Sequence, residues 1–343
     1  MIFVIFLISF FVFSVHITKV GPVYGKLPRG CRLCGKGAKL VLFATGRCPF
    51  SCFYCPISEE RRGREQAFAN ERPIVNLEDL MEEALTMRAL GAGVTGGEPL
   101  ASSATFKFVS FLRENLGERF HIHLYTRVTE AKKLEKAYEA GVDEVRFHFV
   151  DPSPALDFSW SVGAEIPVIP GWKKALKNYI LFLDRLEVEF VNLNELEFSD
   201  ANFLELEKRG FKRKGELDSG VAGSEELALE LLKWAEEEGL GISLHYCSAR
   251  TKTEVQLVER YRRTARNIAR SYERITDEGT IVVGIVGRSK EVIEKLRKIG
   301  CRFEIVGDEI RTSPECVLEL GKGKIVEYWP TFDRKPVEVT PVG

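Results

Sequence analysis

The sequence predicts an α/β protein, a partial barrel of six or seven strand–helix units followed by a small α+β domain. β-rich runs recur between residues 39 and 247, and amphipathic stretches lie between most of them. Repeated units of this length form a parallel sheet, and six or seven of them form a full or partial barrel. After Asp277 the repeat ends, and short β-rich runs with one helix at about 289–299 take its place.

The strand and helix signals alternate along the chain. Each helical stretch follows a capping residue and stops at a glycine; residues 77–90, for example, follow Asn76 and end before Gly91. Their apolar residues recur on one face, as expected of a helix that packs on a sheet. The predicted strands are 40–45, 92–95, 121–126, 143–149, 162–169, 188–194 and 240–247, and the predicted helices include 77–90, 129–140, 199–209 and 224–238.

The first residues differ in composition from the rest of the chain. The run Ile2–Val15 is apolar apart from two serines and has no basic residue ahead of it, which disfavours a secretory signal. It is either a membrane anchor or sequence upstream of a true start near Val20 or Tyr24. We expect a cytoplasmic protein, attached to a membrane only if residues 1–19 belong to it. The expected segments are a hydrophobic segment at 1–24, the barrel at 25–250, a basic helix at 251–275 and the small domain at 276–343.

Composition and charge limit the classes of partner. The 343 residues are 45% hydrophobic and 29% charged, which is typical of a globular chain. The many Lys, Arg and Glu and the few Met favour a thermophilic source. The net charge of -1 predicts no general attraction to polyanions, so that any nucleic-acid contact requires a local patch.

The alternating strands predict a polar barrel interior. The face toward the helices must be apolar, so Val145 and Phe147 point outward and the residues between them point inward. Any one inward polar residue could be a hydrogen-bonded core residue, but burying the whole set without a function would cost stability. The inward set is His121, His123, Tyr125, Glu144, Arg146, His148, Glu165, Asn192, Asn194, Ser243, His245 and Cys247, and we select His148, Asn192, Asn194 and His245 as catalytic candidates.

A cluster of cysteines marks the loop after the first predicted strand. The stretch RCPFSCFYCP holds Cys48, Cys52 and Cys55, three of the eight cysteines in the chain. Structural zinc sites use four ligands, usually in two separated pairs, whereas iron–sulfur clusters are bound by short runs with gaps of two or three residues. Three thiolates therefore predict a 4Fe-4S cluster with one iron left without a protein ligand.

This cysteine run, with Tyr54 before its last member, resembles the signature of the radical S-adenosylmethionine (radical SAM) superfamily. A second motif, TGGEP at Thr95–Pro99, lies where the superfamily places it. The resemblance covers roughly 38–247 and is nearest to the archaeal, pyruvate formate-lyase activating enzyme-related branch. It implies a partial six-unit barrel in which S-adenosylmethionine chelates the open iron. The residues that it implies for binding this cofactor are Tyr54, Gly96, Gly97, Glu98, Tyr125, Glu165 and Ile169, the last two in the stretch VGAEIPVIPG.

The resemblance also implies a reaction. A reduced cluster donates one electron to the sulfonium of S-adenosylmethionine, and the resulting 5'-deoxyadenosyl radical abstracts a hydrogen from the substrate. An electron donor such as ferredoxin or flavodoxin is implied. The substrate stays open between RNA, a glycyl-radical enzyme and another protein or peptide, and a non-catalytic iron–sulfur sensor is the alternative from another class.

Two further features remain outside these motifs. Cys31 and Cys34 in CRLC have the spacing of half a metal site, so they either hold an auxiliary cluster or zinc with Cys247, Cys301 or Cys316, or are unrelated thiols. The arginine-rich stretch that follows Cys247 is either a solvated helix face or an RNA-binding patch that includes Arg262, Arg263 and Arg266. The second interpretation rests on its position, because the stretch begins at a strand end that should open onto the active-site mouth.

Overall fold

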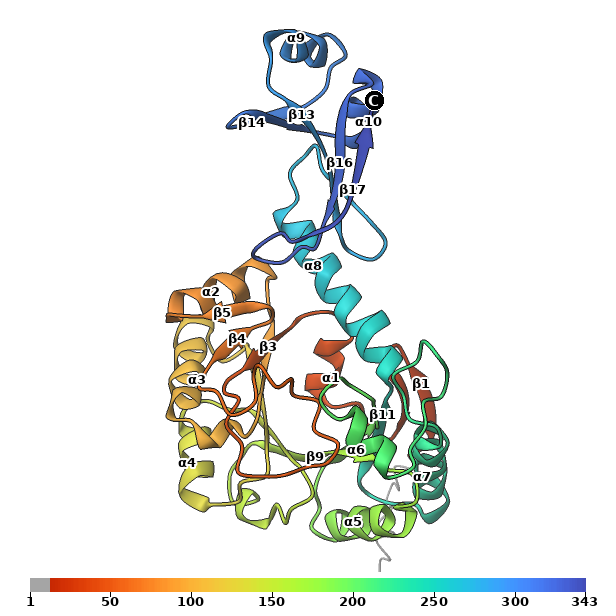
Figure 1. The fold of residues 1–343 in the computed structure, drawn as a ribbon. Helices are drawn as coiled ribbons and strands as arrows, with labels where there is room; N and C mark the ends of the chain where they lie inside the picture. The colour runs from red at the N-terminus through yellow and green to blue at the C-terminus, as the bar shows by residue number, and fades with distance from the viewer. Residues whose placement is uncertain (1–12) are drawn as a thin grey trace, which may run out of the picture.

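The computed structural model describes residues 13–343, and seven parallel strands form the wall of an open barrel (Figure 1). Each strand pairs with the next one along the chain, with helices between them. The predicted partial barrel is confirmed, and every predicted strand is present with its ends shifted by at most a few residues. The strands are β3 (Lys39–Phe43), β6 (Gly91–Thr95), β7 (His121–Thr126), β8 (Glu144–Phe147), β9 (Ser161–Val168), β10 (Phe190–Glu195) and β11 (Ser243–Cys247).

Two antiparallel hairpins extend the edges of this sheet. β1 (Val15–Thr18) and β2 (Gly21–Tyr24) continue the sheet beyond β11, and β4 (Ala67–Ala69) and β5 (Arg72–Ile74) continue it beyond β3. β1 and β5 are the two ends of the strand order, so the barrel does not close by strand pairing.

The first hairpin corrects the boundary expected after residue 24. Tyr24 is 1% exposed and its hydroxyl donates to the carbonyl of Leu240 at 2.6 Å, so residues 15–24 are part of the barrel sheet. The rest of the apolar run expected to be an anchor or a misassigned start, residues 1–12, lies outside the described residues. Between residues 13 and 343, no helix has the length and apolar character needed to cross a membrane.

Helices cover the outer face of the parallel strands (Figure 1). α2 begins with a capping box between Asn76 and Asp79, and α7 ends at Gly239 in the left-handed conformation, as their sequences predict. α2 ends at Thr86, four residues before the predicted end. The outer helices are α2 (Leu77–Thr86), α3 (Ser103–Leu116), α4 (Ala131–Glu139), α5 (Lys173–Arg185) and α7 (Ser224–Glu238), whereas α6 (Phe203–Lys208) packs in a separate cluster with Ile169 and Leu196.

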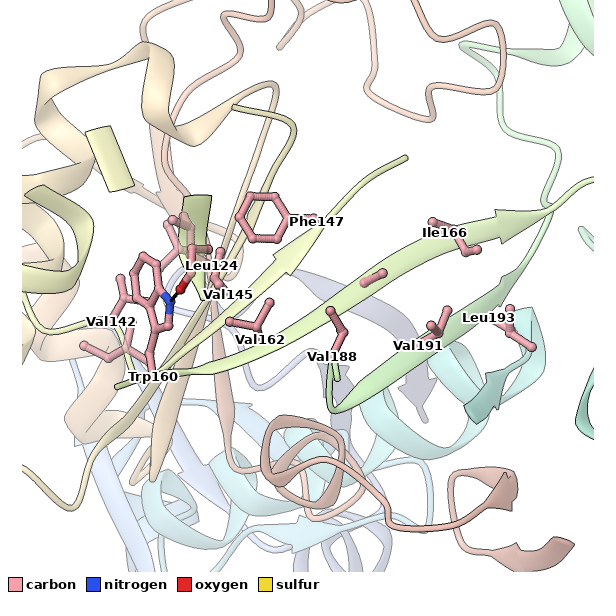
Figure 2. Close-up of a cluster of buried hydrophobic side chains, with 14 of the residues drawn as sticks. Leu124, Val142, Val145, Phe147, Trp160, Val162, Ile166, Val188, Val191 and Leu193 are labelled. Carbon is pink, nitrogen blue, oxygen red and sulfur yellow. Dashed lines mark hydrogen bonds between the residues drawn. The ribbon is translucent and has the colours of Figure 1, made fainter. Parts of the chain in front are cut away.

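The main hydrophobic core lies between the strands and these helices (Figure 2). Val145 and Phe147 on β8 are fully buried in it, as the alternation of that strand predicts. Trp160 lies at its edge and donates its indole N–H to the carbonyl of Ala155 at 2.8 Å. The apolar side chains of the strands therefore point to the helices, and the polar ones are left for the interior.

A short helix occupies the barrel interior at the amino ends of the strands. α1 (Arg29–Cys34) contacts β3, β6 and β7. Gly30 lies so close to the strands that a Cβ there would be 2.5 Å from Arg146 Nη2 and 2.6 Å from His123 Nδ1. Only glycine fits at this position, because any side chain would displace the buried polar groups of β7 and β8.

A helix that follows β11 bridges the two edges of the sheet. It starts as a π-helix at Thr251–Leu257 and continues as α8 (Val258–Ile268). Arg260 is 8% exposed, and it donates to Asn70 Oδ1 at 2.7 Å and pairs with Glu71 in the β4–β5 turn. Near the start of α8, Glu259 pairs with Lys19 of the β1–β2 turn. α8 thus joins the β1–β2 hairpin to the β4–β5 hairpin, which do not pair with each other through strands.

These contacts correct the expectation of an RNA-binding patch at the mouth. Arg263 donates to the carbonyls of Met87 and Arg88 after α2, and Arg262 donates to the carbonyl of Asp277. The helix also runs toward the amino ends of the strands. Gly37, just before β3, lies so close to it that a Cβ there would be 2.2 Å from the carbonyl carbon of Glu259. These arginines bind the protein's own acceptors, at the end of the barrel opposite the mouth.

The predicted small α+β domain follows α8, and its sheet is antiparallel. Its strand order is β14-β15-β13-β16-β17, with β12 paired to β13, and a disulfide joins Cys301 to Cys316. It contacts α8, where the rings of Tyr261 and Trp329 lie 5.2 Å apart, and the barrel sheet itself, where the guanidinium of Arg72 on β5 lies 5.2 Å from the centre of the Phe332 ring. Its elements are β12 (Arg274–Ile275), β13 (Ile281–Gly287), α9 (Lys290–Lys298), β14 (Phe303–Val306), β15 (Glu309–Thr312), α10 (Pro314–Leu320), β16 (Gly323–Tyr328) and β17 (Pro336–Val342).

The bridging role of α8 predicts a stability difference between two arginines of the same helix. Arg260→Ala should lower the free energy of unfolding by about 2 kcal/mol, because the buried Asn70 and the carboxylate of Glu71 lose their cationic partner. Arg266→Ala removes an exposed arginine and should change it by less than about 0.5 kcal/mol. Unfolding in guanidinium chloride measures both, and equal losses would contradict the bridge.

Candidate functional site

The three clustered cysteines lie on one irregular loop at the carboxyl end of β3. Residues 44–66 form no helix or strand, and the loop is closed at its base by Gly46 N, which donates to the carbonyl of Arg64 at 2.8 Å. Cys48 is exposed, Cys52 and Cys55 are half-buried, and none of the three is in a disulfide. The loop therefore presents three free thiols at the end of the barrel where barrel enzymes place their chemistry.

The donor set of this loop fits a 4Fe-4S cluster better than a single metal ion. Among residues 13–343, no three His, Cys, Asp or Glu side chains converge as a single ion requires. A cubane cluster spaces its thiolates more widely than one ion does, and short cysteine runs are its usual ligands. Cys48, Cys52 and Cys55 would hold three of its irons.

Arg127, which follows β7, was not among the residues selected from the sequence. Its Nη1 lies 3.5 Å from Cys52 Sγ, its guanidinium lies 4.6 Å from the centre of the Phe50 ring, and its Nε is buried without a partner. Arg127 therefore places a cation beside one of the three thiols of the loop. The available signal was a basic residue directly after a strand that ends at the mouth.

The glycines of the TGGEP motif pack against the cysteine loop. We predicted that Gly96 and Gly97 let the backbone approach a cofactor, but the close neighbour in the structure is the cysteine loop. A Cβ on Gly97 would lie 2.2 Å from the carbonyl oxygen of Arg47, and one on Gly96 would lie 2.4 Å from that of Thr45. Gly97 N also donates to Thr45 O at 2.7 Å. The two motifs therefore contact each other directly, and cofactor binding by these glycines stays a prediction.

Glu98 is buried and holds the segment after β7. Its carboxylate accepts from Thr126 Oγ1 at 2.6 Å, Arg127 N at 2.8 Å and Leu100 N at 3.0 Å. Burial raises the pKa of Glu98 above its usual value, although these donors act in the opposite direction. A carboxylate has about four acceptor positions, so one remains for the ammonium group that we expected it to bind.

Tyr54, His148 and Ile169 meet beside the cysteine loop. The Tyr54 hydroxyl lies 2.7 Å from His148 Nε2, and His148 Nδ1 lies 2.8 Å from the carbonyl of Glu165. Burial lowers the pKa of His148, so its ring is neutral at neutral pH. Ile169 and Tyr54 pack in one hydrophobic cluster that also includes Phe53. Three residues selected from different stretches of the sequence are thus brought together.

The other selected polar residues form a network deeper in the barrel. Asn192 and Asn194 both donate to Glu165, at 2.8 Å and 2.7 Å. His245 is 1% exposed, with Nδ1 3.0 Å from Asn192 Oδ1 and Nε2 2.9 Å from the carbonyl of Val20. Tyr125 lies 3.0 Å from His123 Nε2. The inward orientation is confirmed, whereas catalytic roles for His148, Asn192, Asn194 and His245 and cofactor contacts for Tyr125, Glu165 and Ile169 stay predictions.

Of the cysteines considered for a second metal site, two form a disulfide in the small domain and three are free thiols in the barrel. Cys301 and Cys316 are joined in the small domain and are not available as ligands. Cys31 accepts from Asn192 Nδ2 at 3.1 Å and Arg146 Nη2 at 3.5 Å. Burial alone would raise the pKa of Cys31, but Arg146 and His245 bring it below its usual value; burial raises the pKa of Cys34 to about 12. An auxiliary cluster or zinc at Cys31, Cys34 and Cys247 stays a prediction.

The contact between the two motifs predicts that Gly97→Ala impairs iron binding. The added methyl group meets the backbone of Arg47, so the cysteine loop must shift, and less iron should be retained after anaerobic reconstitution. Gly215→Ala is a matched control, because the nearest atom to its Cβ is 4.0 Å away. Iron and sulfide analysis of both variants measures the effect, and equal iron contents would contradict the close contact.

Comparison with known proteins agrees with this site. Residues 42–180 match the radical SAM superfamily. The chain is 36% identical to a putative glycyl-radical enzyme activating enzyme of Methanocaldococcus jannaschii over 359 aligned positions, which cover 93% of this chain and 94% of that protein.

Solved structures with a similar trace have little sequence in common with the chain. SuiB of Streptococcus suis with bound S-adenosylmethionine has a TM-score of 0.42 at 9% identity, covering 62% of this chain and 50% of that one. The protein anSMEcpe with bound S-adenosylmethionine has a TM-score of 0.35 at 15% identity, covering 52% of each chain. The chain thus spans about half the length of these structures. On the similarity along its whole length to the archaeal activating-enzyme relative, the protein belongs to the radical SAM superfamily and is an enzyme.

Proposed function

We propose that the protein is an activating enzyme that abstracts a hydrogen from a glycine Cα of a partner protein. The observation that carries this proposal is the 36% identity to the relative named as an activating enzyme, over 93% of this chain. The aligned length includes both the barrel and the small domain, so the similarity is not limited to the cofactor-binding part that members of the superfamily share.

The residues at the mouth have the chemistry that this reaction requires. Cys48, Cys52 and Cys55 hold the cluster, and the loop at Gly96–Glu98 binds S-adenosylmethionine beside it. When bound, the cluster and S-adenosylmethionine together supply a one-electron cleavage that yields a hydrogen-abstracting radical. An external carrier such as ferredoxin or flavodoxin supplies the electron.

The side chains around the loop position these groups and limit access of water. Glu98 fixes the backbone of Arg127, and Arg127 places its guanidinium beside Cys52. The neutral ring of His148 orients Tyr54 without adding a charge near the cluster. Phe53 stacks on Phe211 with a ring separation of 6.3 Å, which places apolar surface on the solvent side of the loop.

The mouth has an open surface that suits a macromolecular substrate. A pocket of about 760 Å³ lies between residues 214–225 and 248–254, next to the carboxyl ends of β10 and β11. Its lining includes Lys214, Asp218, Arg250 and Glu254, which form the ion pairs Lys214–Asp218 and Arg250–Glu254 along its wall. RNA is the weaker candidate, because Arg260, Arg262 and Arg263 of α8 are engaged at the other end of the barrel.

The test follows the abstracted hydrogen. The enzyme is reconstituted anaerobically and reduced with dithionite. It is then incubated with S-adenosylmethionine and with a protein fraction from cells that were grown on glycine deuterated at Cα. We expect 5'-deoxyadenosine that carries deuterium, detected by mass spectrometry, and none with a Cys52→Ala variant. An absence of 5'-deoxyadenosine under every condition contradicts the enzymatic reaction itself. Unlabelled product with the labelled proteins, together with deuterium transfer from a labelled RNA fraction, would replace the protein substrate by RNA.

A further inference from the structure

Two thiols inside the barrel take no part in the proposed reaction. Cys31 and Cys34 lie three residues apart in α1, and neither is in a disulfide. Residues at this spacing in a helix are neighbours on one face. Their Cα atoms then fall within the range of about 4.4 to 6.8 Å that a disulfide requires. The backbone of α1 therefore meets the Cα requirement for a disulfide between these two residues.

The surroundings of the two sulfurs differ. Cys31 is 4% exposed and its sulfur accepts from Asn192 Nδ2 at 3.1 Å and from Arg146 Nη2 at 3.5 Å. Asn192 is fixed in turn by His245, whose Nδ1 lies 3.0 Å from its Oδ1. A guanidinium and an amide N–H both stabilise negative charge on sulfur. Cys34 is half-buried and is the more accessible of the two. Cys34 is therefore the thiol that a small reactant meets first, and Cys31 is held by its donors for the second step.

We propose that Cys31 and Cys34 are a redox-active dithiol that low-molecular-weight disulfides oxidise to an intramolecular disulfide. The Cys34 thiol loses its proton and attacks one sulfur of the small disulfide, which releases one thiolate and leaves a mixed disulfide. The Cys31 thiolate then attacks the sulfur of Cys34 and releases the second thiolate. The net reaction converts two protein thiols and one small disulfide into one protein disulfide and two small thiols.

Oxidation changes the polar network around α1. The bond to Cys34 draws the Cys31 sulfur away from Asn192 and Arg146. Arg146 is 1% exposed and keeps Glu144 and Glu165 as partners, whereas Asn192 loses one of its two acceptors. Since Asn192 and Asn194 both bind Glu165, the redox state of α1 is linked to the residues below the mouth.

The experiment uses a full-length variant in which Cys48, Cys52 and Cys55 are alanine, because these thiols would oxidise independently. Cys31, Cys34 and Cys247 are then the free cysteines that remain. The protein is equilibrated anaerobically in mixtures of reduced and oxidised glutathione, then denatured and alkylated with a maleimide. We expect two thiols to disappear together as the mixture becomes more oxidising, and peptide mapping to find the bond between residues 31 and 34.

Matched variants identify which thiols form the bond. In the same background, Cys247→Ser should leave the transition unchanged, and Cys31→Ser or Cys34→Ser should abolish it. Asn192→Ala removes a donor that stabilises the reduced form, so the equilibrium should move about fivefold toward the disulfide. The proposal is overturned if all three thiols stay reactive in pure oxidised glutathione, if Cys247 supplies one partner, or if Cys31 and Cys34 retain zinc or iron and resist oxidation. None of these outcomes depends on the substrate of the enzyme.

Discussion

A single fully buried charge organises the barrel interior. Arg146 donates from Nε to Glu144 at 2.6 Å and from Nη1 to Glu165 at 2.8 Å, and it contacts Cys31 on α1. A guanidinium removed from water is tolerated only with such partners, and losing one of them would leave an uncompensated charge. Arg146 therefore fixes β8, β9 and α1 relative to one another. Through Glu165, it also helps to position Asn192 and Asn194.

The polar interior of the barrel is largely, but not completely, hydrogen-bonded. Asn192 and Asn194 both donate to Glu165, whereas His123 Nδ1 and Asn194 Oδ1 are buried without a partner. A buried polar atom without a partner costs stability, and such atoms are frequent at functional sites. Above this network lies the cysteine loop, which is held by the backbone N–H groups of Gly97 and Glu98 and is joined to the network by the contact of Tyr54 with His148.

The strands and the cysteine loop could be predicted from the sequence because their signals are local. Alternation in HIHLYT and DEVRFHF determines which side chains face inward, and the spacing of Cys48, Cys52 and Cys55 identifies their chemistry. The role of α8 could not be predicted, since the acceptors of Arg260 lie about 190 residues earlier in the chain. Arg127 was missed for a similar reason: only the fold brings it to Cys52, 75 residues away. The reason for the glycines at 96 and 97 also needed the neighbouring backbone to be known.

The bridge formed by α8 has a mechanical consequence for the whole molecule. The helix connects the β1–β2 edge with the β4–β5 edge, and the small domain continues from its far end (Figure 1). The two edges cannot part without breaking the contacts of Arg260 or turning the helix, and turning the helix must swing the small domain. The contacts that hold the two edges together are therefore also the contacts that set the orientation of the small domain.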